Sequence, residues 1–192
     1  AKTACFKNGL PELGSMRVGI VGLGAIGQAT AERLGAFGCR LGYYSRTKKP
    51  ESCIEYLPLE ELYASSDIVS LHVPVTPETE NMINDETLRG FKPGAILINT
   101  ARGELVDHEA AARAILSGRL GGFGADTLAP EPVLADNPFL KALPPEYRDR
   151  VALSPHIAGI TAGCFIRAYE TIFSNIAAVS RGERPRCVVN GL

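Results

Sequence analysis

A glycine fingerprint near the start of the chain constrains its fold more than any other feature. Residues 18–22 read Val-Gly-Ile-Val-Gly, which is typical of a buried strand, and a helical pattern follows at once. Gly22, Gly24 and Gly27 form G-x-G-x-x-G across this junction. In that order the glycines permit a tight turn, a close approach of backbone to pyrophosphate, and packing of helix on strand. The helix N-terminus attracts phosphate, so the spacing predicts a dinucleotide site.

Strand-like and helix-like segments alternate along the rest of the chain. The predicted strands after the first cover residues 40–44, 68–72, 95–99, 121–126 and 151–154, and the run 95–99 is apolar enough for burial on both faces. Apolar and small residues recur with a helical period from Ile26 to Phe37, and further helical patterns cover 58–63, 84–90, 107–118 and 161–181. A proline-rich loop is expected over 128–145. Such alternation predicts an α/β fold with a doubly wound parallel sheet of Rossmann type.

The acidic residue that normally accompanies this fingerprint is missing. About 20 residues after the glycines, an NAD site places Asp or Glu on the adenosine ribose. Residues 45–49 read Ser-Arg-Thr-Lys-Lys instead. Hydroxyls and cations attract a 2′-phosphate that a carboxylate would repel. Ser45, Arg46 and Thr47 therefore favour NADP over NAD, although a run of charge can also be only a solvated loop.

Composition restricts the other classes of function. The chain has 192 residues, of which 45% are hydrophobic and 21% charged, as expected for an ordinary globular protein with one main domain. With a net charge of -1 no basic patch dominates, so we expect no nucleic-acid partner. No apolar run reaches the ~20 residues of a membrane span and the start lacks a signal-peptide core, so we expect a cytoplasmic protein without membrane contact. Five scattered cysteines without metal-ligand spacing predict reduced thiols and no metal site.

Three polar residues follow predicted strands where ligands bind in such sheets. Arg102 follows the strand 95–99, Glu131 follows the strand 121–126, and His156 follows the strand 151–154. His suits proton transfer near neutral pH, a nearby carboxylate favours its charged form, and Arg grips a carboxylate or keto oxygen. A single His after a strand is more often structural, so the three together carry the prediction of 2-keto acid reduction.

Three other residues are weaker candidates. Asp126, at the end of its strand, either orients a nicotinamide carboxamide or caps a neighbouring backbone group. His72 is expected to pack in the cofactor loop, and His108 to be exposed at a helix start.

Five consecutive segments resemble the signatures of the D-isomer-specific 2-hydroxyacid dehydrogenases. They are GLGAIG from Gly22, LHVPVTPET from Leu71, NTARGELVD from Asn99, GADTLAPEP from Gly124 and SPHIAGIT from Ser154. The resemblance covers most of the chain; it departs at Thr127-Leu128, where the family usually has a β-branched residue and Phe. It implies an NAD(P)-dependent oxidoreductase that transfers hydride reversibly between nicotinamide and a small 2-keto or 2-hydroxy acid. The Ser45-Arg46 replacement is similar to the NADP-preferring glyoxylate and hydroxypyruvate reductase branch.

The resemblance also implies residue roles. Arg102 would bind substrate, His156 would be the acid/base, and Glu131 would pair with His156. The implied cofactor contacts are Gly22, Gly24, Ala25, Ile26, Gly27, Ser45, Arg46, Thr47, Val73, Pro74, Thr79, Thr100, Ala101, Arg102, Asp126, His156 and Gly159.

Family members place a substrate domain before the fingerprint strand, and here only residues 1–17 precede it. We therefore expect a linker remnant at 1–13, a dinucleotide-binding domain at 14–160, and a return helix and tail at 161–192 with an exposed apolar stripe. The chain would be the cofactor-binding portion of a longer enzyme, expected to form a homodimer.

A non-catalytic dinucleotide-sensing module, similar to corepressors that share the fold, is the alternative. The acid/base pair argues against it, because a sensor has no evident need for His156 and Glu131.

Overall fold

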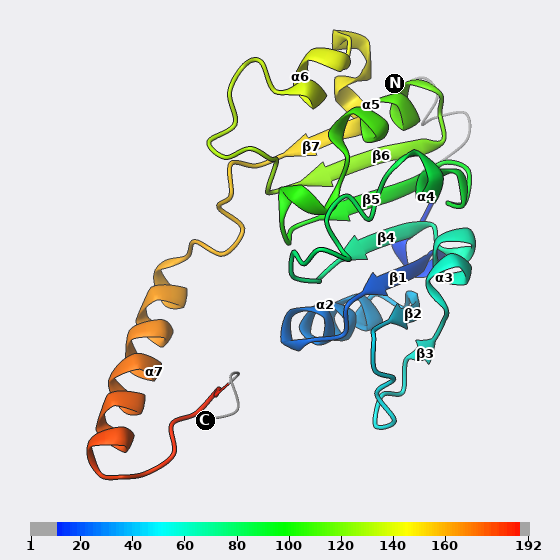
Figure 1. Ribbon diagram of the computed structural model, residues 1–192. Helices are drawn as coiled ribbons and strands as arrows, with labels where there is room; N and C mark the ends of the chain where they lie inside the picture. The colour runs from blue at the N-terminus through cyan, green and yellow to red at the C-terminus, as the bar shows by residue number, and fades with distance from the viewer. Residues whose placement is uncertain (1–10, 189–192) are drawn as a thin grey trace. The chain divides into compact units, whose positions relative to one another are not determined.

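The computed structural model describes residues 11–188, which form two compact units, one up to Pro155 and one from His156 onward. The first unit is built on a seven-stranded sheet in the order β3-β2-β1-β4-β5-β6-β7 (Figure 1). All neighbouring strands are parallel. The predicted α/β class with a doubly wound parallel sheet is therefore confirmed.

The predicted strands agree with the structure to within one residue at each end. The strands are β1 Arg17–Val21, β2 Arg40–Tyr44, β3 Glu55–Tyr56, β4 Ile68–Leu71, β5 Ala95–Asn99, β6 Leu120–Ala125 and β7 Val151–Leu153. The two-residue strand β3 was not predicted. Burial in β5 alternates, with Ile96 and Ile98 only half-buried, so the expectation of burial on both faces is wrong.

The helices of the first unit are α2 Ala25–Ala36, α3 Leu59–Ser65, α4 Asp85–Arg89, α5 His108–Leu116 and α6 Pro138–Ala142. Among its described residues, from 11 onward, this unit also has three 3₁₀ segments, at Leu13–Ser15, Gly103–Leu105 and Pro145–Arg150. Helix α6 lies within the segment expected to be a loop. The helix begins at Pro138 because the buried Asn137 side chain accepts a hydrogen bond from the Phe139 N–H at 3.0 Å.

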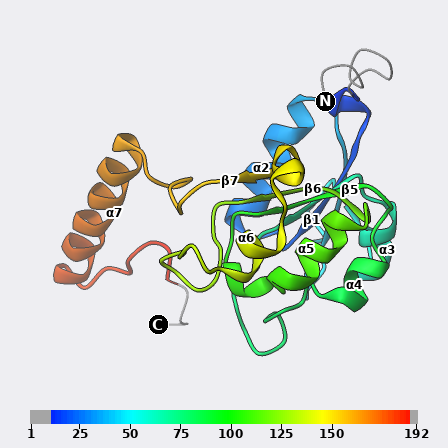
Figure 2. The ribbon, with the colours of Figure 1, turned by 90° about the horizontal axis from the view of Figure 1, so that it is seen from above.

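The two faces of the sheet carry separate cores. Helix α2 covers one face, and α3, α4, α5 and α6 lie on the other (Figure 2). The larger core belongs to the second of these faces and includes Leu71, Leu97 and Phe123 from the strands. The smaller core joins Val18 and Ile20 of β1 to Ala31 of α2.

The helical period predicted α2 correctly but not its buried face. Gly27 and Ala31 are the buried residues of this helix, whereas Ile26 and Phe37 are 70% and 65% exposed. Small residues face the sheet here because the backbone of α2 lies directly against the backbone of the turn after β1. A Cβ atom on Gly27 would lie 2.1 Å from the carbonyl oxygen of Gly22, a residue that turns at φ +97°. The helix can therefore pack at this distance only with glycine at position 27.

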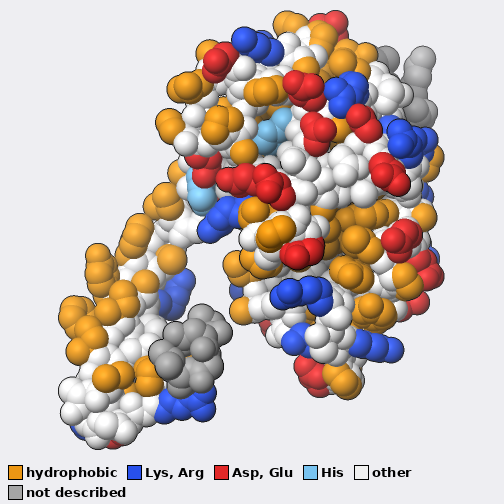
Figure 3. Space-filling model, viewed as in Figure 1, with side chains coloured by type: hydrophobic (Ala, Val, Ile, Leu, Met, Phe, Trp, Pro, Cys, Tyr) orange, Lys and Arg blue, Asp and Glu red, His pale blue; other side chains and the backbone are white. Residues whose placement is uncertain are grey.

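The second unit contains helix α7, Ala162–Ser180, whose N-cap Thr161 accepts a hydrogen bond from the Cys164 N–H at 3.1 Å. This confirms the last predicted helix to within one residue at each end. The apolar side chains along it are exposed, as orange atoms along α7 show in Figure 3. Across residues 11–188, no helix combines the length and the apolar character that a bilayer span requires.

The contact between Gly27 and the Gly22 carbonyl predicts that replacement by alanine destabilises the protein at Gly27 but not at Gly24. Gly27→Ala should destabilise the fold by about 1–3 kcal/mol, because the new methyl group overlaps the Gly22 carbonyl and α2 must move. The measurement is the free energy of unfolding in urea. Gly24→Ala is the matched control, since a Cβ there meets nothing within 4 Å, and it should change stability by less than about 0.5 kcal/mol. Equal losses in both variants would contradict the contact.

Candidate dinucleotide and substrate site

An open groove of about 510 Å³ lies at the carboxyl ends of β1, β2 and β4. This is where the order of strands reverses, because β1 pairs with β2 on one side and β4 on the other. Open parallel sheets bind ligands at such a switch point. The groove brings together eight of the predicted contacts, namely Gly22, Gly24, Ser45, Arg46, Thr47, Val73, Pro74 and Thr79.

The N-terminus of α2 enters this groove through its N-cap, Gly24. No side chain caps the helix, and the space beside the Gly24 Cα is open. The first turn, from Ala25 to Gly27, therefore has backbone N–H groups without helical acceptors and room for an anion next to them. These features fit the pyrophosphate of a dinucleotide.

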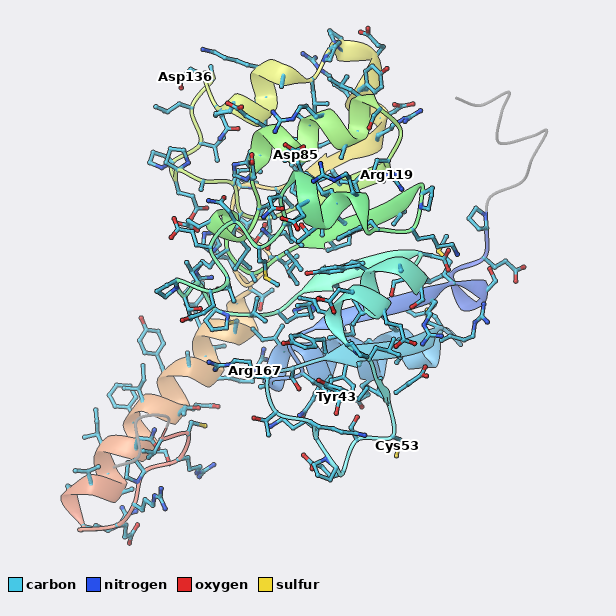
Figure 4. The ribbon with its side chains drawn as sticks, turned by 45° about the vertical axis from the view of Figure 1, so that its right-hand side comes forward. Tyr43, Cys53, Asp85, Arg119, Asp136 and Arg167 are labelled. Atoms are coloured by element: carbon cyan, nitrogen blue, oxygen red, sulfur yellow. The ribbon has the colours of Figure 1, made fainter. Side chains whose placement is uncertain are left out.

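Two side-chain hydroxyl groups bind the backbone of the loop after β2. The Tyr43 hydroxyl accepts a hydrogen bond from the Lys49 N–H at 2.8 Å, and the Ser45 hydroxyl donates to the Thr47 carbonyl at 2.7 Å. Figure 4 shows Tyr43 on β2, where the connection that carries Cys53 begins. The Lys48 ammonium lies 5.6 Å from the centre of the Tyr56 ring, and Arg46 and Lys49 line the groove. Lys49 belongs to the cationic run 45–49 from which the sequence favours NADP.

The loop after β4 is equally ordered. The Thr79 hydroxyl donates to the Pro74 carbonyl at 2.7 Å and accepts from the Thr76 N–H at 2.8 Å. Glu78 lies between these two threonines and lines the groove. Sequence reasoning missed Glu78, because a lone acidic residue in a loop carries no pattern; only its position after a strand could have indicated it.

A second hollow, of about 490 Å³, collects Ile26, Thr100, Ala101 and Arg102. It shares His72, Val73 and Pro74 with the first groove, so the two are adjacent. The fully buried Asn99 side chain shapes the turn, accepting from the Ala101 N–H at 3.1 Å and donating to the Arg102 carbonyl at 2.7 Å. The Arg102 backbone is thus fixed by the last residue of β5.

Asp126 and Glu131 line a third hollow, of about 430 Å³, beyond β6 and β7. Ser154 donates a hydrogen bond to the Asp126 carboxylate. The segment before Glu131 is fixed, because the Asn137 amide donates to the Ala129 carbonyl at 3.0 Å. It also touches the Arg102 turn, since a Cβ on Gly103 would lie 2.3 Å from the Ala129 nitrogen. The loops that carry Arg102 and Glu131 are therefore in direct contact although the two side chains line different hollows.

His156 and Gly159 belong to the second unit, where His156 is its first residue and follows the end of β7 by three positions. The His156 backbone has φ +55°, in the left-handed region that non-glycine residues rarely adopt. The pairing of His156 with Glu131 stays a prediction, as does the orienting role of Asp126.

Most of the sequence matches one known protein family. Residues 5–158 match the family described as D-isomer specific 2-hydroxyacid dehydrogenase, NAD binding domain. The chain belongs to this family.

Relatives and solved structures agree with this membership. A glyoxylate reductase of Korarchaeum cryptofilum is 42% identical over 177 residues, which are 90% of this chain and 52% of that protein. The chain spans about half the length of the curated relatives it matches.

Two solved structures of the family bear on the cofactor. The NAD complex of a D-isomer specific 2-hydroxyacid dehydrogenase from Lactobacillus delbrueckii ssp. bulgaricus has a TM-score of 0.81 and 34% identity, over 95% of this chain and 59% of that one. A probable 2-hydroxyacid dehydrogenase from Rhizobium etli, in complex with NADP, has a TM-score of 0.80 and 27% identity, over 94% and 57%.

One histidine of this family member is buried and another is half-buried. His108 is only 8% exposed at the start of α5, so the expectation of an exposed residue is wrong; its ring lies 6.3 Å from that of Phe139. Burial lowers the pKa of His108, and the backbone of Ala129 and the Asp107 and Glu104 carboxylates only partly oppose this. Burial also lowers the pKa of His72, whose Nε2 lies 3.0 Å from the Ser70 hydroxyl. Both side chains therefore favour the neutral form in the folded protein.

These burial effects predict a pH dependence of stability. A histidine of the unfolded chain has a pKa of about 6.5, so as the pH falls through this value the unfolded state takes up more protons than the folded state. The free energy of unfolding should therefore decrease from pH 7.5 to pH 5.5, measured by urea denaturation. The double variant His72→Gln/His108→Gln should show a smaller decrease, because neither site can then be protonated. A double variant with the same pH dependence as the wild type would contradict the assignment.

Proposed function

We propose that the longer protein to which this chain corresponds reduces small 2-keto acids with NADPH and, in reverse, oxidises D-2-hydroxy acids. The observation that carries the proposal is the groove at the β1/β4 switch point, with the uncapped N-terminus of α2 opening into it. Membership of the dehydrogenase family supports it. The relatives that are glyoxylate reductases support a small keto acid as the substrate class.

The proposed chemistry divides among three residues. Arg102 binds the substrate carboxylate through its guanidinium, His156 donates a proton to the carbonyl oxygen, and Glu131 favours the protonated imidazole. The nicotinamide, when bound, supplies the hydride to the carbonyl carbon. Gly22 to Gly27 hold the pyrophosphate, and Thr100, Ala101 and Asp126 lie toward the nicotinamide end. In the reverse direction His156 accepts the proton that it donated.

The preference for NADP is part of the proposal. Ser45 occupies the position of the usual ribose-binding acid, and the adjacent Arg46 and Lys49 line the groove with positive charge. A guanidinium binds a phosphate with charge-assisted hydrogen bonds, whereas a ribose hydroxyl gains less from it.

The domain boundaries and the assembly are also proposed. Residues 14–160 form the dinucleotide-binding domain and residues 161–192 return toward a substrate domain that covers the apolar side chains of α7. These include Phe165, Tyr169 and Phe173, each more than half exposed. The homodimer implied by the family resemblance is the assembly that we expect.

Replacing the proposed acid tests the reaction. In the full-length protein His156→Gln should lower kcat for glyoxylate reduction by about 10²–10⁴-fold, because proton transfer to the carbonyl oxygen is lost. Calorimetric binding of NADPH should change less than twofold. The readout is NADPH oxidation with glyoxylate, hydroxypyruvate and pyruvate. Near-normal turnover in the variant would refute the role of His156, and a wild-type protein that binds NADPH without reducing any keto acid would favour the sensing module.

Replacing the proposed phosphate ligand tests the cofactor. Arg46→Ala should weaken NADPH binding by about tenfold, equivalent to one charge-assisted contact, and NADH binding by less than twofold. Lys48→Ala is the matched control, because Lys48 lies over the Tyr56 ring rather than in the groove. It removes the same charge two residues away and should leave the NADPH to NADH ratio within twofold. A wild type that binds NADH as tightly as NADPH would overturn the preference.

A further inference from the structure

The groove at the β1/β4 switch point has one acidic side chain in its lining, counted over the described residues, and it is Glu78. The cationic side chains in the same lining are Arg46 and Lys49. Because β2 and β4 pair with opposite edges of β1, the loop with Arg46 and the loop with Glu78 border the groove from opposite sides. The loop after β2 has no carboxylate in this groove, but the loop after β4 supplies one, that of Glu78.

The surroundings of Glu78 favour its charged form. Hydrogen bonding to Thr76, then to its own backbone N–H, and a smaller contribution from the Arg46 charge lower the pKa of the Glu78 carboxyl. Thr76 is itself fixed, because its N–H donates to the Thr79 hydroxyl at 2.8 Å. Glu78 is therefore ionised at neutral pH, and it lines the same groove as Arg46.

This arrangement distinguishes two forms of one ligand. A phosphate on the 2′ position carries a charge of roughly -1.5 to -2 near pH 7, whereas a free 2′-hydroxyl carries none. A carboxylate that partly neutralises Arg46 therefore opposes the phosphorylated form and has little effect on the other.

We propose that Glu78 is a specificity-determining residue. Its carboxylate partly neutralises the Arg46 charge and so weakens binding of NADPH relative to NADH. The inference rests on the proposed binding of a dinucleotide in this groove. It assigns the final selectivity to the balance between two loops rather than to the loop after β2 alone.

The experiment is calorimetric titration of the 192-residue chain with NADPH and with NADH at 50 mM and 1 M NaCl. Glu78→Gln, which keeps an acceptor for Thr76, should tighten NADPH binding by about 3–10-fold at low salt and change NADH binding by less than twofold. At 1 M NaCl, where the screening length is about 3 Å, the gain for NADPH should fall below twofold.

Two further variants identify the cause. Glu80→Gln removes the same charge two residues along the chain, where the side chain lines a different hollow, and should leave NADPH binding within twofold of the wild type. In an Arg46→Ala background, Glu78→Gln should lose at least half of its effect, because the charge for which it competes is gone. An equal gain in Glu80→Gln, an undiminished gain without Arg46, or no gain in Glu78→Gln would each overturn the inference.

The outcomes for Glu78 and for the proposed cofactor preference are distinguishable. The wild-type ratio of NADPH to NADH affinity tests the preference, whereas the ratio between variant and wild type tests Glu78. A wild type that prefers NADH together with a gain in Glu78→Gln would overturn the preference and support the inference. Binding of neither dinucleotide would overturn both.

Discussion

The close contact between α2 and the turn after β1 is the constraint on which the site depends. Gly27 lies against the Gly22 carbonyl, at a distance that excludes even a methyl group. This contact fixes where α2 begins, and its first N–H groups therefore open at the carboxyl end of β1. The groove lies beside these N–H groups because β2 and β4 pair with opposite edges of β1, and the loops that follow the two strands therefore diverge at its carboxyl end. A displacement of α2 would thus change the shape of this groove.

The sequence predicted the parts of the fold that depend on local patterns. Strand limits followed from apolar runs, and Asn84 and Asp107 cap the helices that they were expected to begin. The buried face of α2 could not be predicted from its apolar residues, because Gly27 and Ala31 make the contact while Ile26 remains exposed. His108 was misjudged for a related reason: burial at a helix start depends on Phe139, which is 31 positions further along the chain.

The candidate site divides in the same way. Residues inside motifs, such as Gly22, Gly24 and Arg46, were predicted from spacing and come together in one groove. Glu78 was missed, since its place in the lining arises from a groove that strands distant in the sequence create. The contact between Gly103 and Ala129 was equally inaccessible. It joins the loop of Arg102 to the segment before Glu131, so the spacing of these two loops is set by backbone packing.

The Tyr43 hydroxyl has a consequence for how such a protein can change during evolution. It binds the backbone of Lys49, and the Ser45 hydroxyl likewise binds a backbone carbonyl, so the path of this loop depends little on the side chains at positions 46–49. Those side chains can vary without a cost to the core. A lineage could thereby change the charge of this groove through a few surface substitutions, with the sheet and the glycine turn retained.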